Sequence, residues 1–296
     1  MRAMILAAGL GTRLRPFTLL KPKPLFPVLG EPLLLRIVNQ LRAAGFTSII
    51  INAYHLADQL LAFFKGHQDI IIQQEPLELG TGGGLRMALP HFKDEAILVT
   101  NGDIYHDIDY GEVYARHQAS GAPLTMVMHD YPRFNKVLVD GGLVRGFTGF
   151  LPASDPGMES KLQAFTGIHV LDPYLLKRIP TDRFYSIIDC YQRHADAGGV
   201  IQALTVTNHH WRDIGTLDDY LSLHRTLLLD AQTPFRCADS AVIGRDVTLD
   251  DWGFVDSGAT IGDGATLRRV VVWPQAVIPA GATLSDTLVT SLGGGL

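Results

Sequence analysis

The sequence predicts an α/β protein whose main sheet is mostly parallel, followed by a short left-handed β-helix at the C-terminal end. Two observations support this fold class. From residue 1 to about 230, short apolar runs typical of strands alternate with stretches of helical periodicity, as in a parallel sheet covered by helices. In roughly the last 60 residues, apolar side chains recur at every sixth position, which is the period of hexapeptide coils.

Length and composition exclude several classes of protein. The chain has 296 residues, enough for about two domains. Hydrophobic residues make up 47% and charged residues 19%, which excludes intrinsic disorder as the main state. No apolar run reaches the roughly 18 residues of a membrane span and no signal-type segment is present, so we expect a cytoplasmic protein. The two cysteines, Cys190 and Cys237, lie far apart and support neither a disulfide framework nor a zinc site.

Strands and helices can be placed in order along the first part of the chain. Residues 33–44 put Leu34, Ile37 and Leu41 on one helical face, and Gly45 is positioned to end that helix. The candidate strands are residues 3–8, 48–52, 69–73, 96–100 and 123–128. Further helices are expected at residues 56–64, 111–119, 172–179, 187–197 and 217–230.

Three loops of this predicted sheet should share one crevice. In open parallel sheets, ligands bind beyond the carboxyl ends of the strands. The loops expected there are residues 9–24, 74–84 and 101–107. The functional site is therefore expected where these three loops meet.

The C-terminal tail shows the six-residue period directly. The apolar positions are Ile243, Leu249, Val255, Ile261 and Leu267, followed after one deleted position by Val272, Ile278 and Leu284. We therefore divide the chain into a larger domain at 1–232 and a β-helix at 236–291. Such coils cap a neighbouring domain or join subunits, so a homo-oligomer through this tail is one expectation.

Charge is unevenly distributed along the chain. The net charge is −5, which gives no reason to expect nucleic acid or a membrane as a partner. The first 30 residues nevertheless contain five basic side chains and no acidic one: Arg2, Arg13, Arg15, Lys21 and Lys23. A basic pocket near the start of an acidic chain suggests an anionic ligand.

A glycine-rich turn after the first strand suggests that this ligand carries phosphates. The stretch from Gly9 to Pro16 reads GLGTRLRP, and its glycines let backbone N–H groups approach phosphate oxygens closely. It is not a dinucleotide fingerprint, because the third glycine of that pattern would fall on Leu14. It is not a P-loop either, because no Gly-Lys-Ser/Thr follows.

The sequence resembles the nucleotidylyltransferases that join a nucleoside triphosphate to a sugar 1-phosphate. The resemblance rests on GxGTRL at residues 9–14 with the KPKPL segment at 21–25, and on further motifs at 75–84, 101–103 and 211–216. It covers nearly all of residues 1–230 and implies a Rossmann-like fold, nucleotide-sugar synthesis and Mg²⁺ as cofactor. The implied partners are a nucleoside triphosphate and a sugar 1-phosphate.

The resemblance also implies roles for individual residues. Arg13 and Lys23 would act on the phosphates as catalytic cations, because neutralising charge is the main task in such transfers. Asp103 and Asp213 would hold Mg²⁺ through carboxylate oxygens. The nucleotide would be bound by Leu6, Ala8, Gly9, Gly11, Thr12, Gln74, Glu75, Thr81 and Gly82. The sugar would be bound by Asn101, Gly102 and Gly167.

Several substrate details stay open at this level. Glu78 is inserted into a motif that usually reads Pro-Leu-Gly-Thr, so the base is not fixed. GTP with mannose 1-phosphate is the leading pair, and UTP or dTTP with an amino-sugar or hexose 1-phosphate is the alternative. The family's sugar-phosphate lysine has no clear counterpart, and Lys136 or Lys161 could replace it, while Asp189 could reach the sugar or cap a helix. A non-catalytic subunit that binds nucleotide sugars is a further alternative, although the four motif residues Arg13, Lys23, Asp103 and Asp213 are all present.

Overall fold

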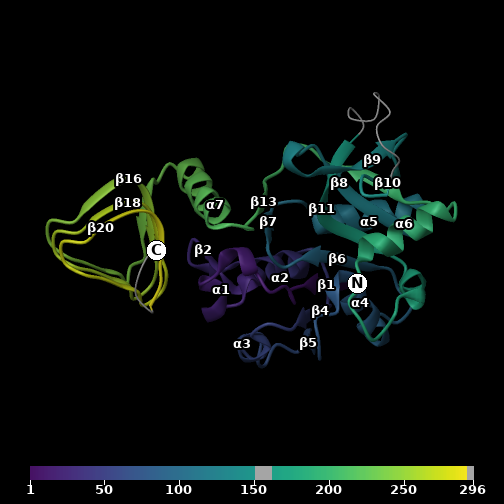
Figure 1. Ribbon diagram of the computed structural model, residues 1–296, viewed down its shortest axis with the longest axis horizontal. Helices are drawn as coiled ribbons and strands as arrows, with labels where there is room; N and C mark the ends of the chain where they lie inside the picture. The colour runs from purple at the N-terminus through teal and green to yellow at the C-terminus, as the bar shows by residue number, and fades with distance from the viewer. Residues whose placement is uncertain (151–161, 292–296) are drawn as a thin grey trace. The chain divides into compact units, whose positions relative to one another are not determined.

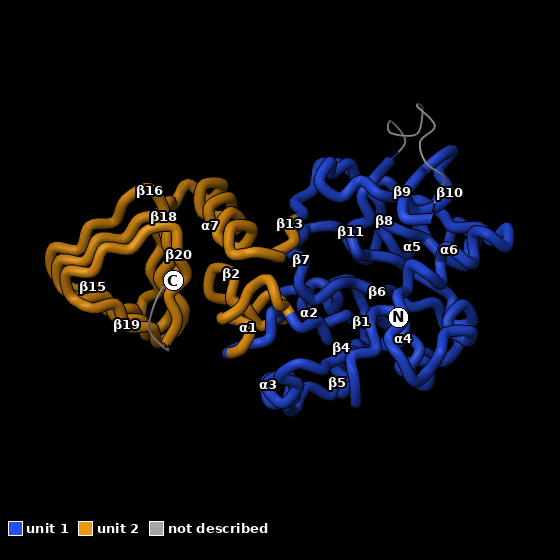
Figure 2. Tube along the Cα trace, viewed as in Figure 1, with its two compact units in different colours: residues 1–10, 20–24, 36–211 blue, residues 11–19, 25–35, 212–296 orange. Residues whose placement is uncertain are grey.

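A computed structural model describes residues 1–150 and 162–291 of the chain (Figure 1). The chain divides into two compact units, neither of which is continuous in sequence (Figure 2). Unit 1 comprises residues 1–10, 20–24 and 36–211. Unit 2 comprises residues 11–19, 25–35 and the chain from 212 onward.

Unit 1 is built on a nine-stranded mixed sheet with the order β5-β4-β1-β6-β11-β8-β12-β10-β9. Strands β5, β4, β1 and β6 are mutually parallel, whereas β11 runs antiparallel to both β6 and β8. The strands are β1 (Arg2–Leu6), β4 (Ser48–Ala53), β5 (Ile70–Gln74), β6 (Ile97–Asn101), β8 (Leu124–His129), β9 (Asn135–Asp140), β10 (Leu143–Phe147), β11 (Leu162–Leu171) and β12 (Gln202–Thr205).

The sequence explains the parallel part of the sheet better than the antiparallel part. Strands β1, β4 and β6 have continuous apolar centres, such as Ile49–Ile51, whose residues are fully buried, as expected where helices cover both faces of a sheet. All five predicted strands are confirmed within two residues at either end. The expectation of a mostly parallel sheet holds for β5, β4, β1 and β6 and for the pair β8–β12, and is wrong for β9, β10 and β11, which pair antiparallel.

The helices follow the predicted positions with two corrections. Residues 74–84 were expected to be a loop, but helix α4 begins at Gly80. Residues 172–179 form a 3₁₀ helix, η6 (Pro173–Arg178). The helices of unit 1 are α3 (Ala57–Phe63), α4 (Gly80–Met87), α5 (Tyr110–Ser120) and α6 (Ile187–Asp196), with short 3₁₀ turns η3 (Leu89–His91) and η4 (Pro132–Phe134). Unit 1 also contains β7 (Ile104–His106). Three further elements include residues of both units: η2 (Lys23–Leu25), α2 (Leu33–Ala43) and β13 (Trp211–Asp213).

Unit 2 contains a stack of parallel strands whose apolar positions lie in register. Ile243 pairs with Ile261 and then Ile278, and Val255 pairs in the same way with Val272 and Val289. The six-residue period therefore becomes columns of like side chains along the stack. One sheet consists of β14 (Phe235–Cys237), β16 (Thr248–Val255), β18 (Thr266–Val272) and β20 (Thr283–Val289), and the other of β15 (Val242–Ile243), β17 (Thr260–Ile261) and β19 (Val277–Ile278).

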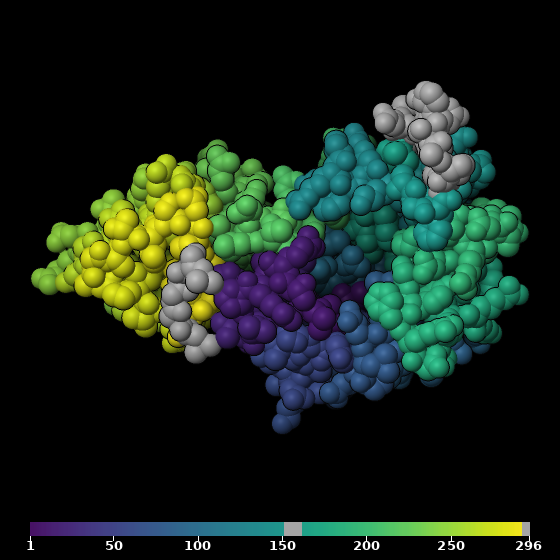
Figure 3. All heavy atoms as spheres, in the orientation of Figure 1, coloured from purple at the N-terminus to yellow at the C-terminus, as the bar shows by residue number. Residues whose placement is uncertain are grey.

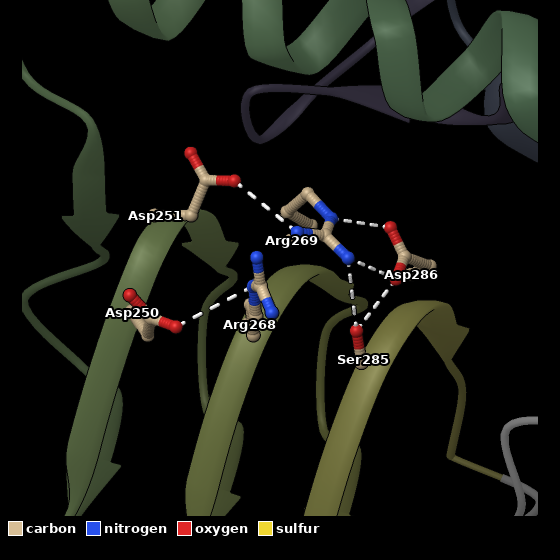
Figure 4. Close-up of polar contacts among 6 residues, drawn as sticks. All are labelled: Asp250, Asp251, Arg268, Arg269, Ser285 and Asp286. Atoms are coloured by element: carbon tan, nitrogen blue, oxygen red, sulfur yellow. Dashed lines mark hydrogen bonds and ion pairs between the residues drawn. The ribbon is translucent and has the colours of Figure 1, made fainter.

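A polar column runs along the outside of this stack. The Arg269 guanidinium lies between carboxylates of the neighbouring rungs, Asp251 at 3.4 Å and Asp286, to which it donates hydrogen bonds (Figure 4). Arg268 pairs with Asp250 at 3.4 Å in the same region. The hydrogen bonds from Arg269 lower the pKa of Asp286, so this carboxylate is ionised at neutral pH.

Helix α7 and an early segment of the chain complete unit 2. The Trp273 indole N–H donates to the Tyr220 hydroxyl at 2.9 Å, and that hydroxyl donates to the carbonyl of Pro27. The Phe26 ring meets Trp273 edge-on, with 4.7 Å between the ring centroids. The elements involved are η1 (Thr12–Leu14), α1 (Phe17–Leu20), β2 (Pro27–Val28), β3 (Glu31–Pro32) and α7 (Leu217–Asp230).

Among the described residues, none of the helices has both the length and the apolar character needed to cross a bilayer.

Candidate functional site

A pocket of about 380 Å³ opens at the carboxyl edge of the parallel strands of unit 1. Four neighbouring strands supply its floor, through residues at or just beyond their ends, as expected for an open α/β sheet. These residues are Leu6, Ala8 and Gly9 from β1, Asn52 from β4, Glu75 from β5, and Asn101 and Asp103 from β6. Glu78, Gly80, Thr81, Phe184 and Ser186 complete the wall.

A buried carboxylate is the main polar feature of this pocket. Glu75 is 4% exposed, and its Oε1 accepts a hydrogen bond from the Asn52 side-chain amide at 2.7 Å. The Asn52 Oδ1 atom accepts in turn from the Ala7 backbone N–H at 2.7 Å, which fixes the amide orientation. Burial raises the pKa of Glu75, and the hydrogen bond from Asn52 partly opposes that effect.

Gly84 makes room for this pair of side chains. A Cβ atom at Gly84 would lie 2.5 Å from Glu75 Oε1 and 2.7 Å from Asn52 Nδ2. The Gln73 side chain also reaches this point and donates to the Gly84 carbonyl at 2.9 Å. The glycine-rich start of α4 is therefore required by close side-chain approach and not by loop flexibility.

The first turn of α4 is held by a remote segment of the chain. The Tyr185 carbonyl accepts from the Gly82 N–H at 2.8 Å, and the Thr81 hydroxyl accepts from the Ile187 N–H at 2.9 Å. This contact brings Phe184, an exposed aromatic ring, to the wall of the pocket. Thr81 lines the pocket as expected, while Gly82 packs against Tyr185.

The proposed catalytic lysine is paired with a proposed metal ligand. The Lys23 ammonium lies 2.6 Å from Asp103 Oδ2, and the lysine residue is 7% exposed. Pro22 and Pro24 flank Lys23 and restrict its backbone, so its position costs little conformational entropy. Because Asp103 lines the pocket, this pair places one positive and one negative group at its edge.

The second ion pair joins the proposed catalytic arginine to the other proposed metal ligand, and it lies within unit 2. Arg13 Nη2 is 3.8 Å from Asp213 Oδ2, and the Arg13 side chain is 60% exposed. Both side chains lie against Gly215, where a Cβ atom would be 2.6 Å from Asp213 and 2.8 Å from Arg13. Gly11 and Thr12 belong to the same unit, and Gly11 adopts the left-handed conformation (φ 60°) just before η1.

The predicted sugar-binding residues come together only in part. Gly167 has φ +86°, and a Cβ atom there would lie 2.7 Å from Asn101 Nδ2, which itself lines the pocket. The Gly102 N–H donates to the Leu6 carbonyl at 2.8 Å. Lys136 is exposed on β9, and Asp189 lies in the first turn of α6. Lys161 lies outside the described residues.

Sequence reasoning left one choice open and missed three pocket residues that lie outside the sequence motifs. Of the two candidates for the base edge, Glu75 lines the pocket, whereas Gln74 is exposed. Asn52 was missed, although it stands at a strand end where pocket residues are expected. Phe184 and Ser186 were also missed, because nothing in the local sequence signals that their segment packs on α4.

Within residues 1–150 and 162–291, the structure contains no cluster of three or more His, Cys, Asp or Glu side chains suited to a metal ion. Asp103 belongs to unit 1 and Asp213 to unit 2.

The sequence of this chain is similar to those of known proteins. Residues 2–137 match the family described as "Nucleotidyl transferase". The chain is 30% identical over 250 residues to UTP--glucose-1-phosphate uridylyltransferase of Synechocystis, an alignment that covers 77% of this chain and 63% of the length of that relative. It is 28% identical over 302 residues to mannose-1-phosphate guanylyltransferase 1 of Arabidopsis thaliana, covering 98% of this chain and 81% of that protein.

A solved structure shares the fold. HddC from Yersinia pseudotuberculosis superposes with a TM-score of 0.63 at 24% identity, covering 76% of this chain and 99% of that one. Residues 2–137 thus match the nucleotidyl transferase family, and both named relatives are sugar-1-phosphate nucleotidylyltransferases.

Proposed function

We propose that this chain transfers a guanylyl group from GTP to mannose 1-phosphate. A phosphate oxygen of the sugar 1-phosphate attacks the α-phosphorus of GTP and forms the new P–O bond. The bond from that phosphorus to the oxygen bridging the α- and β-phosphates breaks, and pyrophosphate leaves with the bonding electrons. The products are GDP-mannose and pyrophosphate.

The buried carboxylate of Glu75 is the observation that supports guanine. An ionised carboxylate is purely an acceptor of hydrogen bonds, and the pairing edge of guanine offers N1–H and the N2 amine as donors. Uracil and thymine offer one N–H flanked by two carbonyl oxygens, which a carboxylate would repel. Asn52 donates to Oε1 of Glu75 and the Leu79 N–H donates to Oε2 at 3.4 Å, which leaves further lone pairs of the carboxylate for a base.

The phosphates would be bound by the two basic side chains of the sequence motifs, Lys23 and Arg13. Lys23 is nearly buried and would hold its ammonium in place without reorganising, which suits charge that develops during transfer. The Arg13 guanidinium is exposed and forked, so it would bind two phosphate oxygens at once. Phosphoryl-type transfers depend mainly on this kind of positioning and charge neutralisation.

We further propose that Asp103, which lines the pocket of unit 1, contributes a carboxylate to Mg²⁺ bound with the triphosphate. Magnesium usually takes one or two carboxylates plus phosphate oxygens and waters, so a cluster of three protein ligands is not required. When bound, the ion would neutralise charge on the phosphates. The ion pair between Lys23 and Asp103 supports this proposal, because it places a carboxylate ligand beside a fixed cation at the edge of the pocket.

The proposed sugar, mannose 1-phosphate, is supported by one of the relatives and by the position of Asn101. The Arabidopsis relative is named for mannose 1-phosphate and aligns along 98% of this chain, which favours that sugar. Asn101, held against Gly167, would offer its amide to sugar hydroxyls. UTP with glucose 1-phosphate is the second candidate, since the Synechocystis relative is named for that reaction.

For the C-terminal stack we propose a left-handed β-helix of hexapeptide repeats that joins copies of the chain. The aligned apolar columns and parallel pairing support it. Size-exclusion chromatography with light scattering would test assembly, because removing residues 236–291 should leave a monomer.

Pyrophosphate release tests the proposed reaction. GTP, UTP, dTTP and ATP would each be combined with mannose, glucose and N-acetylglucosamine 1-phosphates in the presence of Mg²⁺. The proposal expects the highest kcat/KM for GTP with mannose 1-phosphate, and none without the metal. Turnover with UTP alone would favour the second candidate. Tight binding of a nucleotide sugar without turnover in any combination would indicate a non-catalytic subunit.

A further inference from the structure

A second pocket lies in unit 1 beside η6 and α6, apart from the residues of the nucleotide pocket. It has a volume of about 440 Å³, within the range of small-molecule sites. Its residues belong to the segment 174–197, whose surface is green in Figure 3. None of its lining residues also lines the first pocket.

The floor of this second pocket is apolar and uncharged. Leu175, Ile179 and Tyr185 are buried there, and Cys190 is partly buried. Burial raises the pKa of both the Tyr185 phenol and the Cys190 thiol, so both stay neutral at neutral pH. The floor therefore suits the aromatic or aliphatic body of a ligand.

The rim is basic. Arg178 and Arg193 are exposed and, within the described residues, neither forms an ion pair, although Arg193 lies over the Tyr185 ring at 5.5 Å. His194 Nε2 is buried and has no hydrogen-bond partner among the described residues. No acidic side chain is among the residues that line this pocket. Two guanidiniums match one anionic group.

We propose that this pocket is a second ligand site for a small anion with an apolar body, such as an aromatic phosphate, sulfonate or carboxylate. The floor binds the apolar body, and Arg178 and Arg193 bind the charged group.

The position of Tyr185 links this site to the first pocket. Its ring forms part of the second floor, while its carbonyl accepts from Gly82 and its N–H donates to the Leu79 carbonyl at 2.9 Å. A ligand that packs on the Tyr185 ring is therefore connected, through these hydrogen bonds, to the first turn of α4, which carries Thr81. We extend the proposal accordingly: occupancy of the second site changes the affinity of the nucleotide pocket. This extension rests on the proposed function.

Anilinonaphthalene sulfonate is a suitable probe, because it combines an aromatic body with one anion and fluoresces in apolar surroundings. It would be titrated into the full chain without any nucleotide. The variants are Arg178→Gln/Arg193→Gln, which removes the rim charge, and Ala197→Trp, which fills the mouth. Lys177→Gln is the matched control, since Lys177 is exposed on η6 but does not line the pocket.

We expect saturable binding to the wild type and to Lys177→Gln. The Kd of the probe should be raised at least about tenfold both in Arg178→Gln/Arg193→Gln and in Ala197→Trp. No saturable binding to the wild type, or an equal Kd in all four proteins, would overturn the site. Because no nucleotide is present, either result leaves the proposed function untouched.

The link to the first pocket needs a second titration. GTP binding would be measured by calorimetry with and without saturating probe, in the wild type and in the double variant. A probe-dependent shift in the GTP Kd only in the wild type supports the link. A wild-type Kd that the probe does not change overturns the link, while failure of GTP to bind in any condition would count against the proposed function.

Discussion

At the scale of single residues, the buried Glu75 carboxylate determines what the nucleotide pocket can recognise. Burial raises its pKa, so its protonation falls at a higher pH than the usual value of about 4.3 for glutamic acid. Protonation replaces an acceptor by a donor, and guanine then loses its partner. We therefore expect GTP affinity to weaken as pH falls through a range above that usual value. Calorimetry across pH measures this, and Glu75→Gln should lack the step; identical profiles would refute the assignment.

Lys23 is the second residue whose role can be isolated. Replacement by Met keeps the length of the side chain and removes the charge opposite Asp103. We expect kcat to fall by about a hundredfold to a thousandfold, the usual loss for one fixed group that stabilises transition-state charge. Steady-state kinetics with circular dichroism for folding would measure it. Lys65→Met, at an exposed site on unit 1, is the control and should keep wild-type kcat. A Lys23→Met enzyme as active as this control would exclude a catalytic role.

The pocket residues that stand at or just after the end of a strand could be predicted from the sequence. Gly9, Glu75, Asn101 and Asp103 each follow or end a recognisable apolar run, and all line the pocket. Phe184 could not be predicted in this way, because its position depends on contacts made by segments about 100 residues apart in sequence, such as Ile187 with Thr81. Pattern and propensity do not contain such long-range pairings.

At the scale of elements, the helix α4 shows where propensity misleads. Glycine lowers helix propensity by about 1 kcal/mol per residue relative to alanine, so the run Gly82–Gly84 predicts a loop. The structure nevertheless has a helix, whose first turn is held by hydrogen bonds to the segment of Tyr185 and Ile187. Glycine is needed in it because Tyr185 and the Glu75–Asn52 pair leave no space for a Cβ atom. Tertiary contact overrides local preference here.

The stacked strands of unit 2 offer an element-scale prediction. A Cβ atom at Gly262 would lie 2.3 Å from the Ala280 backbone nitrogen of the next rung. Gly264 has φ +68° and open space around its Cβ position. We expect Gly264→Ala to cost about 1 kcal/mol through backbone strain alone, and Gly262→Ala to cost about 1–3 kcal/mol more because two rungs must separate. Urea unfolding followed by tryptophan fluorescence would compare them; equal midpoints would contradict close packing of the rungs.

At the scale of the whole molecule, sequence periodicity predicts the parallel half of the sheet and the C-terminal stack, but not the antiparallel half. Strands β9 and β10 are half-buried and irregular, with a register shift between Val144 and Gly146, so their sequence has no continuous apolar run. The columns of Ile243, Ile261 and Ile278 are, in contrast, directly visible as a period.

Buried histidines also make the stability of the whole chain depend on pH. Burial lowers the pKa of His169 on β11 to about 3, whereas an unfolded imidazole titrates near 6.5. Between these values the unfolded chain binds a proton that the folded chain does not, so stability falls as pH falls from about 6.5 toward about 3. His169→Leu should reduce the slope of unfolding free energy against pH by up to about 1.4 kcal/mol per pH unit.

Urea unfolding at several pH values measures this slope. His210→Leu, at an exposed position, is the control and should keep the wild-type slope. A His169→Leu slope equal to that of the wild type would contradict the prediction, because it would mean that His169 binds its proton equally in the folded and unfolded chains.

The central claim is that the nucleotide pocket recognises guanine through hydrogen bonds to the Glu75 carboxylate. The most direct measurement is the ratio of kcat/KM for GTP to that for UTP, with mannose 1-phosphate, in the wild type and in Glu75→Gln. We predict a wild-type ratio above about 100 and a fall of at least about tenfold in the variant, because a glutamine amide can pair with uracil. A wild type that prefers UTP, or a variant whose ratio is unchanged while both activities fall equally, would contradict the claim.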